Sequence, residues 1–501
     1  MTSLSKRRPT SNPLALPPIQ RLPPEIFSLI FEILSKAGPD DIRASSHPSV
    51  LVSHVCSAWR TIAISTPGLW KRITLNPLIA CFLTHADWQP FYHYIPLDMM
   101  GQLQASTNAL SLFLSRSRCS PLTLSLGGVT FTNHKSCQSN SETIDERRKE
   151  VVSMLLETTP RWKALTFESP PAGCACSSCR DAELCTIWDL DAQKLPILEE
   201  LDVIEPPGEW PALFDVPSLK RVKLGGWKDD WKSYATKWSS LTDLTIGRWE
   251  ITGDRMLDPR HSISLTKLLT LLPLCPSLRR CRLCLSNSVQ SDTPRADSDS
   301  DVPLPSIITL PHLECLSVLN LRPVNSFAVS VELPALRELS LYAATPEDSD
   351  DPPALTDEEP ILSWSRHHGS GLSHLTLGKV VFNPQTLCAI LEASPNLTSF
   401  TLETYVDVMD KVVLDRLTGG MDQLCPDLES LTVNLSEKIL RNEGELEDQL
   451  WIEELGGFRD DIGPKVYVED VVRLAKARRG MGVLKEFTWG MVEWEGRGPF
   501  S

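Results

Sequence analysis

The hydrophobic positions of this chain follow two different periods. Between residues 22 and 70 apolar side chains recur at the spacing of amphipathic helices. From residue 198 onward a shorter pattern returns, in which Leu-x-x-Leu-x-Leu, with conservative apolar substitutions, follows a proline or another turn residue. Its last two apolar positions alternate with polar ones, as in a short strand with one buried face. The pattern therefore predicts a small helical segment followed by many strands.

Helix signals are clear in the N-terminal segment. Pro23 and Pro24 suit the opening turn of a helix, where a missing N–H costs little, and Glu25 suits the positive end of the helix dipole. A second amphipathic helix is predicted from Leu51 to Ala63, and proline and glycine end it at residues 65–68. Length and spacing thus indicate a helical unit of about sixty residues.

The residues in this segment occur in a recognisable order: Leu22-Pro23-x-Glu25-Ile26, then Val52-Ser53-x-Val55-Cys56-x-x-Trp59-Arg60, then Pro67-x-Leu69-Trp70. Over residues 19–76 this order resembles the F-box. The resemblance implies a module that docks on a Skp-type adaptor and, through it, on cullin and RING subunits of a ubiquitin ligase. The adaptor-binding positions that it implies are Leu22, Pro23, Ile26, Val55, Cys56, Trp59, Arg60, Leu69 and Trp70. The alternative is an ordinary amphipathic two-helix cap.

The strand pattern recurs at uneven spacing through the rest of the chain. Strands of this kind, stacked side by side, predict a parallel sheet with a continuous apolar core, covered by helices at residues 150–156, 265–272, 386–392 and 468–477. The region resembles the irregular leucine-rich-repeat region that often follows an F-box, as in fungal F-box proteins, although the usual repeat asparagine is missing. The clearest copies begin at Leu198, Leu219, Leu241, Leu278, Leu313, Leu336, Leu372, Leu397, Leu428 and Leu484.

The predicted fold class is α/β, with a small all-helical F-box-like module and an irregular leucine-rich-repeat-like solenoid. A competing all-β fold is disfavoured because helical segments separate the strands. The expected organisation is a flexible tail at 1–18, the F-box-like domain at 19–76, and a substrate-recognition domain at 77–501 with acidic insertions near 286–305 and 345–368.

Charge and hydropathy narrow the function classes. A formal net charge of −15 over 501 residues disfavours nucleic-acid binding, which relies on clustered lysine and arginine. No apolar run approaches the length of a membrane span, and the residues after Lys6-Arg7-Arg8 lack the apolar core of a secretory signal. We therefore expect neither membrane nor nucleic-acid partners, and a cytoplasmic or nuclear location, or both.

Exposed positions of the strands supply candidates for binding a protein client. If the sheet faces the partner, basic residues at its centre are placed to meet an acidic or phosphorylated segment, because guanidinium groups match carboxylate and phosphate oxygens. The alternative is a set of ordinary solvated strand residues. Tryptophans at 210, 227, 231, 238 and 249 are predicted to be core or loop contacts. The candidate client-binding residues are Arg221, Lys223, Arg280, Arg282, Tyr342 and His374.

Candidate chemistry is sparse elsewhere. Cys174, Cys176, Cys179 and Cys185 are dense enough for a zinc site, but their spacing lacks a second CxxC, so a reduced surface loop is favoured and no metal or cofactor is predicted. Catalytic motifs are absent from the sequence. The sequence therefore predicts a non-catalytic substrate receptor of an SCF-type ligase, with an unidentified client. The alternative is a ubiquitin-independent scaffold whose F-box-like segment caps the repeats, and an unrecognised enzyme is disfavoured.

Overall fold

The computed structural model forms two compact units, residues 1–166 with 174–187 and residues 167–173 with 188–501, and we describe each by itself. The residues that the structure describes are 22–37, 41–75, 99–126, 141–167, 187, 190–203, 212–225, 235–247, 262–286, 307–319, 324–343, 358–380, 383–404, 411–419, 423–436, 473–478 and 485–492.

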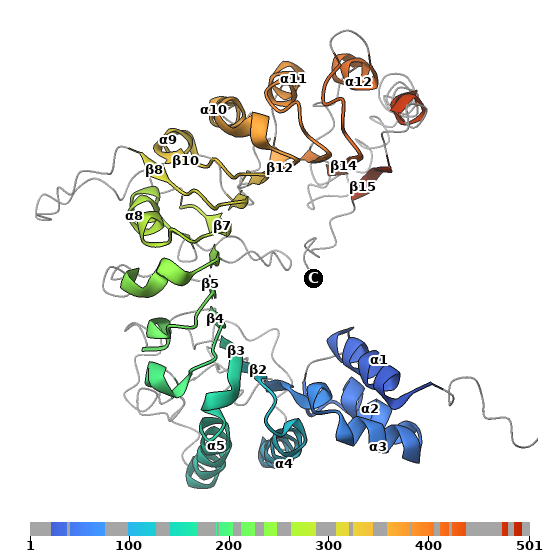
Figure 1. Cartoon of the computed structure of the whole chain (residues 1–501), viewed down its shortest axis with the longest axis vertical. Coiled ribbons are helices and arrows are strands. Elements are labelled where there is room, and N and C mark those ends of the chain that lie inside the picture. The colour runs from blue at the N-terminus through green and yellow to red at the C-terminus, as the bar shows by residue number, and fades with distance from the viewer. Residues whose placement is uncertain are drawn as a thin grey trace, which may run out of the picture. The chain divides into compact units, whose positions relative to one another are not determined.

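The first unit contains the N-terminal helices and three strands (Figure 1). Its elements are α1 (Pro24–Ala37), α2 (Pro48–Val55), α3 (Ser57–Ser65), the 3-10 helix η2 (Pro67–Trp70), β1 (Arg72–Leu75), α4 (Met99–Ser117), β2 (Leu122–Leu126), α5 (Ser141–Leu156) and β3 (Trp162–Phe167).

Helix α1 begins at Pro24, as the sequence predicts, but the single helix predicted over residues 51–63 is wrong. The structure has two helices there, separated at Cys56, whose backbone is extended (φ −157°, ψ 171°). The Cys56 Sγ accepts a hydrogen bond from the Trp59 N–H and caps α3, and Arg60 Nε donates to the Ser53 carbonyl across the break (2.8 Å). Side-chain capping therefore replaces the backbone bonds that a continuous helix would have made.

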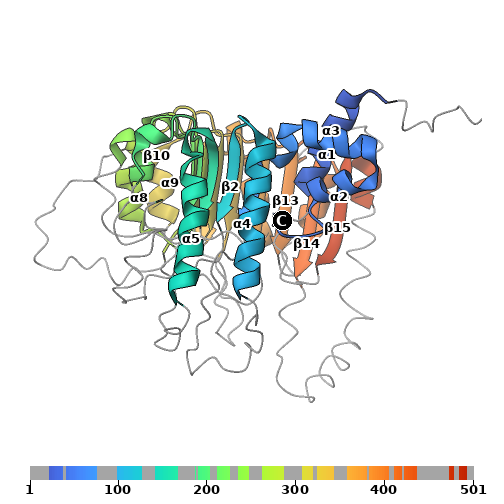
Figure 2. The same cartoon turned by 90° about the horizontal axis from the view of Figure 1, so that it is seen from below.

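Behind these helices, Trp70 anchors the module to the rest of the first unit. Its fully buried indole donates to the Ala63 carbonyl (2.7 Å), lies edge-on to Phe113 of α4, and carries the Arg116 guanidinium 4.3 Å above its ring. Strand β1 pairs in parallel with β2, and α4 and α5 lie side by side (Figure 2). The helical module thus shares a core with the strands that follow it.

The second unit repeats strands and helices (Figure 1). Its strands are β4 (Glu200–Val203), β5 (Arg221–Leu224), β6 (Asp243–Ile246), β7 (Arg280–Cys284), β8 (Ile308–Thr309), β9 (Cys315–Leu319), β10 (Val331–Glu332), β11 (Glu338–Tyr342), β12 (His374–Val380), β13 (Ser399–Thr404), β14 (Ser430–Ser436) and β15 (Glu486–Val492). Its labelled helices are α8 (Leu265–Leu271), α9 (Val324–Ser330), α10 (Glu358–His368), α11 (Pro384–Glu392) and α12 (Lys411–Thr418).

The strands predicted from the Leu-x-x-Leu-x-Leu copies are neighbours in one parallel sheet, in the order β4-β5-β6-β7-β9-β11-β12-β13-β14-β15. Their register superposes equivalent positions: Leu339 lies between Leu316 and Leu375, and Leu341 lies between Val318 and Leu377. These side chains are at most 2% exposed. The helices lie along one side of this sheet (Figure 1), which leaves the alternate residues on the opposite face.

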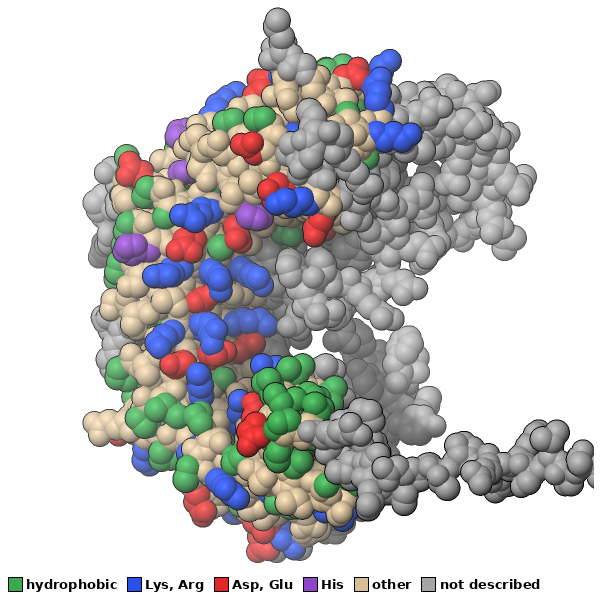
Figure 3. All heavy atoms as spheres, turned by 45° about the vertical axis from the view of Figure 1, so that its right-hand side comes forward, with side chains coloured by type: hydrophobic (Ala, Val, Ile, Leu, Met, Phe, Trp, Pro, Cys, Tyr) green, Lys and Arg blue, Asp and Glu red, His purple; other side chains and the backbone are tan. Residues whose placement is uncertain are grey.

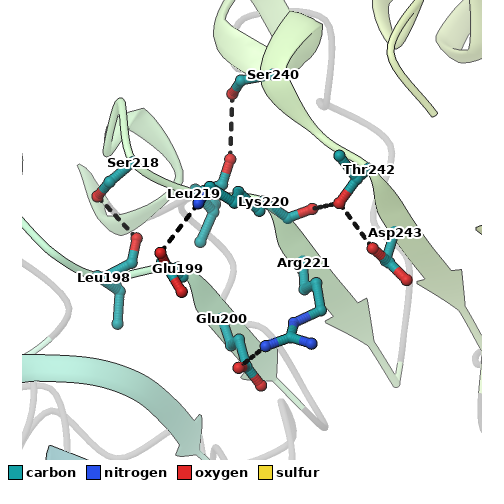
Figure 4. A network of polar contacts seen from close by, with 10 residues as sticks. All are labelled: Leu198, Glu199, Glu200, Ser218, Leu219, Lys220, Arg221, Ser240, Thr242 and Asp243. Atoms are coloured by element: carbon teal, nitrogen blue, oxygen red, sulfur yellow. Dashed lines mark hydrogen bonds and ion pairs between the residues drawn. The ribbon is translucent and has the colours of Figure 1, made fainter. Parts of the chain in front are cut away.

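Side chains also tie adjacent strand units together near their first leucine (Figure 4). Ser218 Oγ donates to the Leu198 carbonyl (2.8 Å), and Ser240 Oγ donates to the Leu219 carbonyl (3.1 Å). Between the same two units as the Ser240 bond, the Thr242 backbone N–H donates to the Lys220 carbonyl (2.8 Å). Because each bond joins equivalent positions of neighbouring units, it reinforces the register that the buried leucines set.

Residues 358–368, predicted as part of an acidic insertion, form helix α10 instead. The reason is an apolar face at helical spacing: Ile361 and Trp364 are both fully buried, and Trp364 packs against Phe327 of α9 (centroids 5.5 Å apart). Because acidic residues stand near the start of α10, sequence reasoning assigned the segment to an acidic insertion and overlooked its helical spacing of apolar residues. Acidic residues in the first turn in fact favour a helix.

A buried arginine closes the chain turn after α12. Arg478, 1% exposed, donates to the carbonyls of Leu417 (2.7 Å), Leu424 (2.7 Å), Cys425 (3.0 Å) and Pro426 (3.0 Å). Cys425 has a positive φ of 46°, a conformation that non-glycine residues adopt only when their surroundings hold it. The guanidinium group thus satisfies four carbonyl acceptors of this part of the chain.

We predict that Arg478→Ala destabilises the second unit by at least about 1–3 kcal/mol, the cost of leaving a buried polar group unsatisfied. Arg473→Ala, which removes an exposed partner of Asp415 from the same helical segment, should change stability by less than about 1 kcal/mol. Hydrogen exchange of the α12 amides measures both effects. Equal protection in the two variants would contradict the role assigned to Arg478.

His368 should make folding stability depend on pH. Burial, together with His367, lowers the pKa of His368 from 6.5 to about 4, and its Nε2 is buried without a hydrogen-bond partner. Between these two pH values the unfolded chain therefore binds a proton that the folded chain does not, so stability falls as the pH falls from about 6.5 toward 4.

We predict that His368→Phe flattens this pH dependence, because the ring is kept and the proton site is removed. Thermal unfolding midpoints measured from pH 7 to pH 4.5 test it, with the exposed His374→Phe as the matched control. Parallel midpoint curves for the native chain and His368→Phe would show that another group is responsible.

Candidate functional site

One face of α1 exposes an unusual amount of apolar surface. Large side chains at 26, 29, 30, 33 and 34 are 38–57% exposed, and the neighbouring helices add further exposed apolar residues. Buried area stabilises folding by about 25 cal/mol per Å², so surface left in water at this density marks an interaction site. We call this set the α1 apolar face: Leu22, Ile26, Leu29, Ile30, Ile33, Leu34, Leu51, Val55 and Ile64.

The opposite side of α1 holds the module together. Phe27 and Phe31 are 5% and 0% exposed, and the Trp59 ring of α3 lies 5.5 and 5.1 Å from their centroids. Ser28 Oγ is 2.9 Å from Thr66 Oγ1, which adds a polar link between α1 and the end of α3. Because these contacts fix α1 from behind, its apolar face is presented as a rigid surface.

The predicted adaptor-binding residues fall into different environments. Leu22, Pro23, Ile26, Val55 and Cys56 are exposed, with Leu22 and Ile26 at 38% and 42% and Val55 at 60%. Their exposure leaves them available to a partner. Pro23 also supports the start of α1, because its carbonyl accepts the N–H groups of residues 26 and 27.

Leu69 and Trp70 require a correction. They are 2% and 0% exposed, and Trp70 is held by Ala63 and Phe113, so their side chains have no surface to offer to an adaptor. Their place is in the core that supports the module. Trp59 is partly exposed but engaged with Phe27, and Arg60 is committed in part to the Ser53 carbonyl, so both also position the helices.

Sequence reasoning missed several members of the α1 apolar face. Leu29, Ile33 and Leu51 are more exposed than Leu22 or Ile26, at 57%, 57% and 52%. The sequence did contain an indication of this exposed surface: the apolar residues of α1 cover more of the helix circumference than one buried stripe requires. Periodicity alone does not tell which of two apolar sides faces the protein's own core.

Comparison with known protein families agrees with this geometry. The F-box-like family matches the chain over residues 19–76. The segment is an F-box-like domain. A search of curated proteins found no match to the chain. The F-box-like domain therefore supplies α1, α2, α3 and η2, and the α1 apolar face is its exposed surface.

In the second unit, the exposed face of the sheet carries bands of like charge along single strands (Figure 3). The residue before β4 and the outward positions of β4 are acidic, and the equivalent positions of β5 and of β7 are all basic. The acidic band is Glu199, Glu200 and Asp202, the β5 basic band is Lys220, Arg221 and Lys223, and the β7 basic band is Arg279, Arg280 and Arg282.

The acidic band at β4 neutralises the β5 basic band. Lys220 Nζ lies 3.0 Å from Glu199 Oε1, Arg221 contacts Glu200 (Figure 4), and Lys223 Nζ lies 3.2 Å from Asp202 Oδ2. Each cation therefore has an acid at the same register position of β4. The predicted client-binding residues Arg221 and Lys223 belong to this paired set.

Acids lie farther from Arg279 and Arg280 of the β7 basic band. Arg279 Nη1 is 3.9 Å from Glu314 Oε1 and Arg280 Nη1 is 3.6 Å from Asp243 Oδ1, both beyond hydrogen-bond distance. Asp243 is also engaged by the Thr242 hydroxyl (2.7 Å). The side chains of Arg279 and Arg280 are 64% and 70% exposed. Cys315, Asp243 and Glu338 raise the pKa of Arg280, which stays cationic.

Tyr342 and His374 lie on neighbouring strands of the same sheet. The Tyr342 ring lies over Gly378 of β12, where an added Cβ would be 2.1 Å from the ring. Burial and Glu403 raise the pKa of Tyr342 to about 12. His374 Nδ1 is 2.8 Å from Ser373 Oγ, and the His374 side chain is exposed. Both residues are oriented by neighbours and reach the sheet surface.

Other candidates from the sequence contribute little. Trp238 is buried, and tryptophans 210, 227, 231 and 249 lie outside the described residues, as do Cys174, Cys176, Cys179 and Cys185. Across the described part of the chain, no group of three or more His, Cys, Asp or Glu side chains could hold a metal ion. In that same part, no helix combines the length and apolarity needed to cross a bilayer.

The two sides of α1 should respond differently to mutation. Phe31→Ala should cost about 3–5 kcal/mol, because it removes a fully buried ring between Phe27 and Trp59. Ile33→Ala should cost less than about 1 kcal/mol, because that side chain is 57% exposed. Denaturant unfolding followed by circular dichroism measures both. A large loss for Ile33→Ala would mean that its side chain is covered in solution.

Proposed function

We propose that this protein is the substrate-recognition subunit of an SCF-type cullin-RING ubiquitin ligase. In this proposal the α1 apolar face binds a Skp-type adaptor and, through it, cullin and RING subunits. The second unit acts as an irregular leucine-rich-repeat-like solenoid whose exposed sheet face holds the client. The receptor performs no chemistry: it raises the effective concentration of client lysines near the conjugating enzyme. Its location would be cytoplasmic, nuclear or both.

The observation that carries the proposal is the α1 apolar face within a matched F-box-like domain. A helix whose buried side already supplies Phe27 and Phe31 to the core does not need five more large apolar residues for folding. The set is unfavourable in water and favourable in an interface, where aliphatic side chains supply the buried centre. The parallel register of the second unit supports the repeat assignment.

A specific observation also favours a second function, that of a ubiquitin-independent scaffold in which the F-box-like domain caps the repeats. Trp70 and His47 both pack against Phe113 of α4, with ring centroids 5.1 and 5.0 Å away. The domain does shield the apolar end of the next element. However, the capping contacts and the α1 apolar face use different residues, so capping leaves the adaptor surface unexplained.

Adaptor co-purification tests the proposal. The native chain should retain a Skp-type adaptor, and Ile26→Lys with Ile33→Lys should lose at least about 90% of it, because two ammonium groups would be buried at the interface. Val329→Lys with Val412→Lys is the matched control, since both residues are similarly exposed (59% and 56%) but belong to the second unit.

Thermal unfolding of the three proteins checks that each is folded. Adaptor that is absent from the native chain, or that is retained equally by all three proteins, would remove the ligase-receptor function and favour the scaffold. Reconstitution with cullin and RING subunits then measures whether the captured adaptor assembles into a complete ligase.

A further inference from the structure

The four basic residues predicted to contact a client are not equivalent, because the sheet separates them into two bands. Arg221 and Lys223 belong to the β5 basic band, where every cation meets an acid of β4 at the same register position. Arg280 and Arg282 belong to the β7 basic band, where the acids paired with Arg279 and Arg280 are Glu314, the residue before β9, and Asp243 of β6, at 3.9 and 3.6 Å. An incoming anion therefore competes with a close acid at each position of the β5 basic band, and with more distant acids at Arg279 and Arg280.

The pairing of β4 with β5 shows which ligand fits such a band. Acids at positions i, i+1 and i+3 of one extended segment neutralise bases at i, i+1 and i+3 of the next: Glu199-Glu200-x-Asp202 pairs with Lys220-Arg221-x-Lys223. The β7 basic band has the same spacing, Arg279-Arg280-x-Arg282. The chain thus contains its own example of an extended carboxylate segment bound by three bases at this spacing.

We infer that the β7 basic band binds an extended acidic segment of the client, with aspartate or glutamate carboxylates spaced as in β4. Arginine suits this task because its planar fork can donate two hydrogen bonds to one carboxylate. The exposed positions of Arg279 and Arg280 leave those donors accessible from the solvent side of the sheet. This inference rests on the proposed function for the identity of the partner as a client, but the binding itself does not require the adaptor.

Local rather than overall charge must drive this contact. The whole chain carries a formal charge of −15, which repels an acidic segment at long range. The Debye length is about 8 Å at physiological ionic strength, so charges beyond the neighbouring strands are largely screened there. The local field is then set by the three arginines together with the acids closest to them, Asp243, Glu314 and Glu338. Binding should accordingly be confined to β7 and its immediate neighbours.

A peptide-binding experiment with the full-length chain tests the inference. The probe is a fluorescein-labelled twelve-residue peptide that repeats Glu-Glu-Ala-Asp, measured by anisotropy at physiological salt. Arg279→Ser with Arg280→Ser and Arg282→Ser should weaken binding by at least about tenfold, since charge-assisted hydrogen bonds are lost. Lys220→Ser with Arg221→Ser and Lys223→Ser removes the same charge from β5 and should change affinity by less than about threefold.

Several outcomes would overturn the inference. Equal weakening by the two triple variants would show a response to net charge alone, and unchanged binding in the β7 variant would place the peptide elsewhere. Tenfold tighter binding of a peptide with phosphoserine at the acidic positions would replace the carboxylate ligand by a phosphorylated one. Binding that appears only when Asp297, Asp299 and Asp301 are changed to Asn would assign the band to the chain's own acidic segment.

Further measurements separate this inference from the proposed function. Thermal unfolding and adaptor co-purification of the β7 variant should both match the native chain, because its substitutions lie in the second unit on exposed positions. Loss of peptide binding with the adaptor retained supports the β7 basic band. A native chain that binds the peptide but no adaptor would support the β7 basic band and reject the ligase-receptor function. If the triple β7 variant does not fold, the single variant Arg280→Ser replaces it in the test and must then weaken peptide binding.

Discussion

The parallel register of the second unit is the constraint on which the rest of that unit depends. Adjacent strands place equivalent positions side by side, so the buried positions form rows of leucine and related side chains, as Leu316, Leu339 and Leu375 illustrate. A slip by one residue would turn every apolar side chain outward. The same register brings Glu200 opposite Arg221, and it therefore arranges the surface charges as well as the core.

In the first unit a comparable constraint acts on a single helix. Phe27 and Phe31 hold α1 against Trp59, while Ile26 and Ile33 remain in water. Core packing on one side thereby gives the F-box-like domain a rigid apolar surface on the other. Trp70 performs the separate task of joining the domain to α4, so structural support and partner binding use different side chains.

Both surfaces share one physical feature: a rigid layer of buried side chains holds a second layer of side chains exposed to the solvent. On α1 the presented groups are aliphatic and match an apolar interface. On β7 they are guanidinium groups and match carboxylates. In the proposed function, these two surfaces would hold two other molecules close together.

Much of this could be predicted from the sequence, because it follows from local order and period. The prolines at the start of α1, the F-box-like order over 19–76 and the alternating leucines of the strands are short-range patterns, and the family comparison and the parallel sheet agree with them. Sequence reasoning also identified four residues of the two basic bands, Arg221, Lys223, Arg280 and Arg282, but not Lys220 or Arg279. Tertiary structure alone decided which of them are neutralised, since the partner of Arg221 is twenty-one positions away in β4. It likewise buried Trp70, broke the second helix at Cys56 and folded α10 around Trp364, because burial and pairing depend on neighbours that periodicity does not identify.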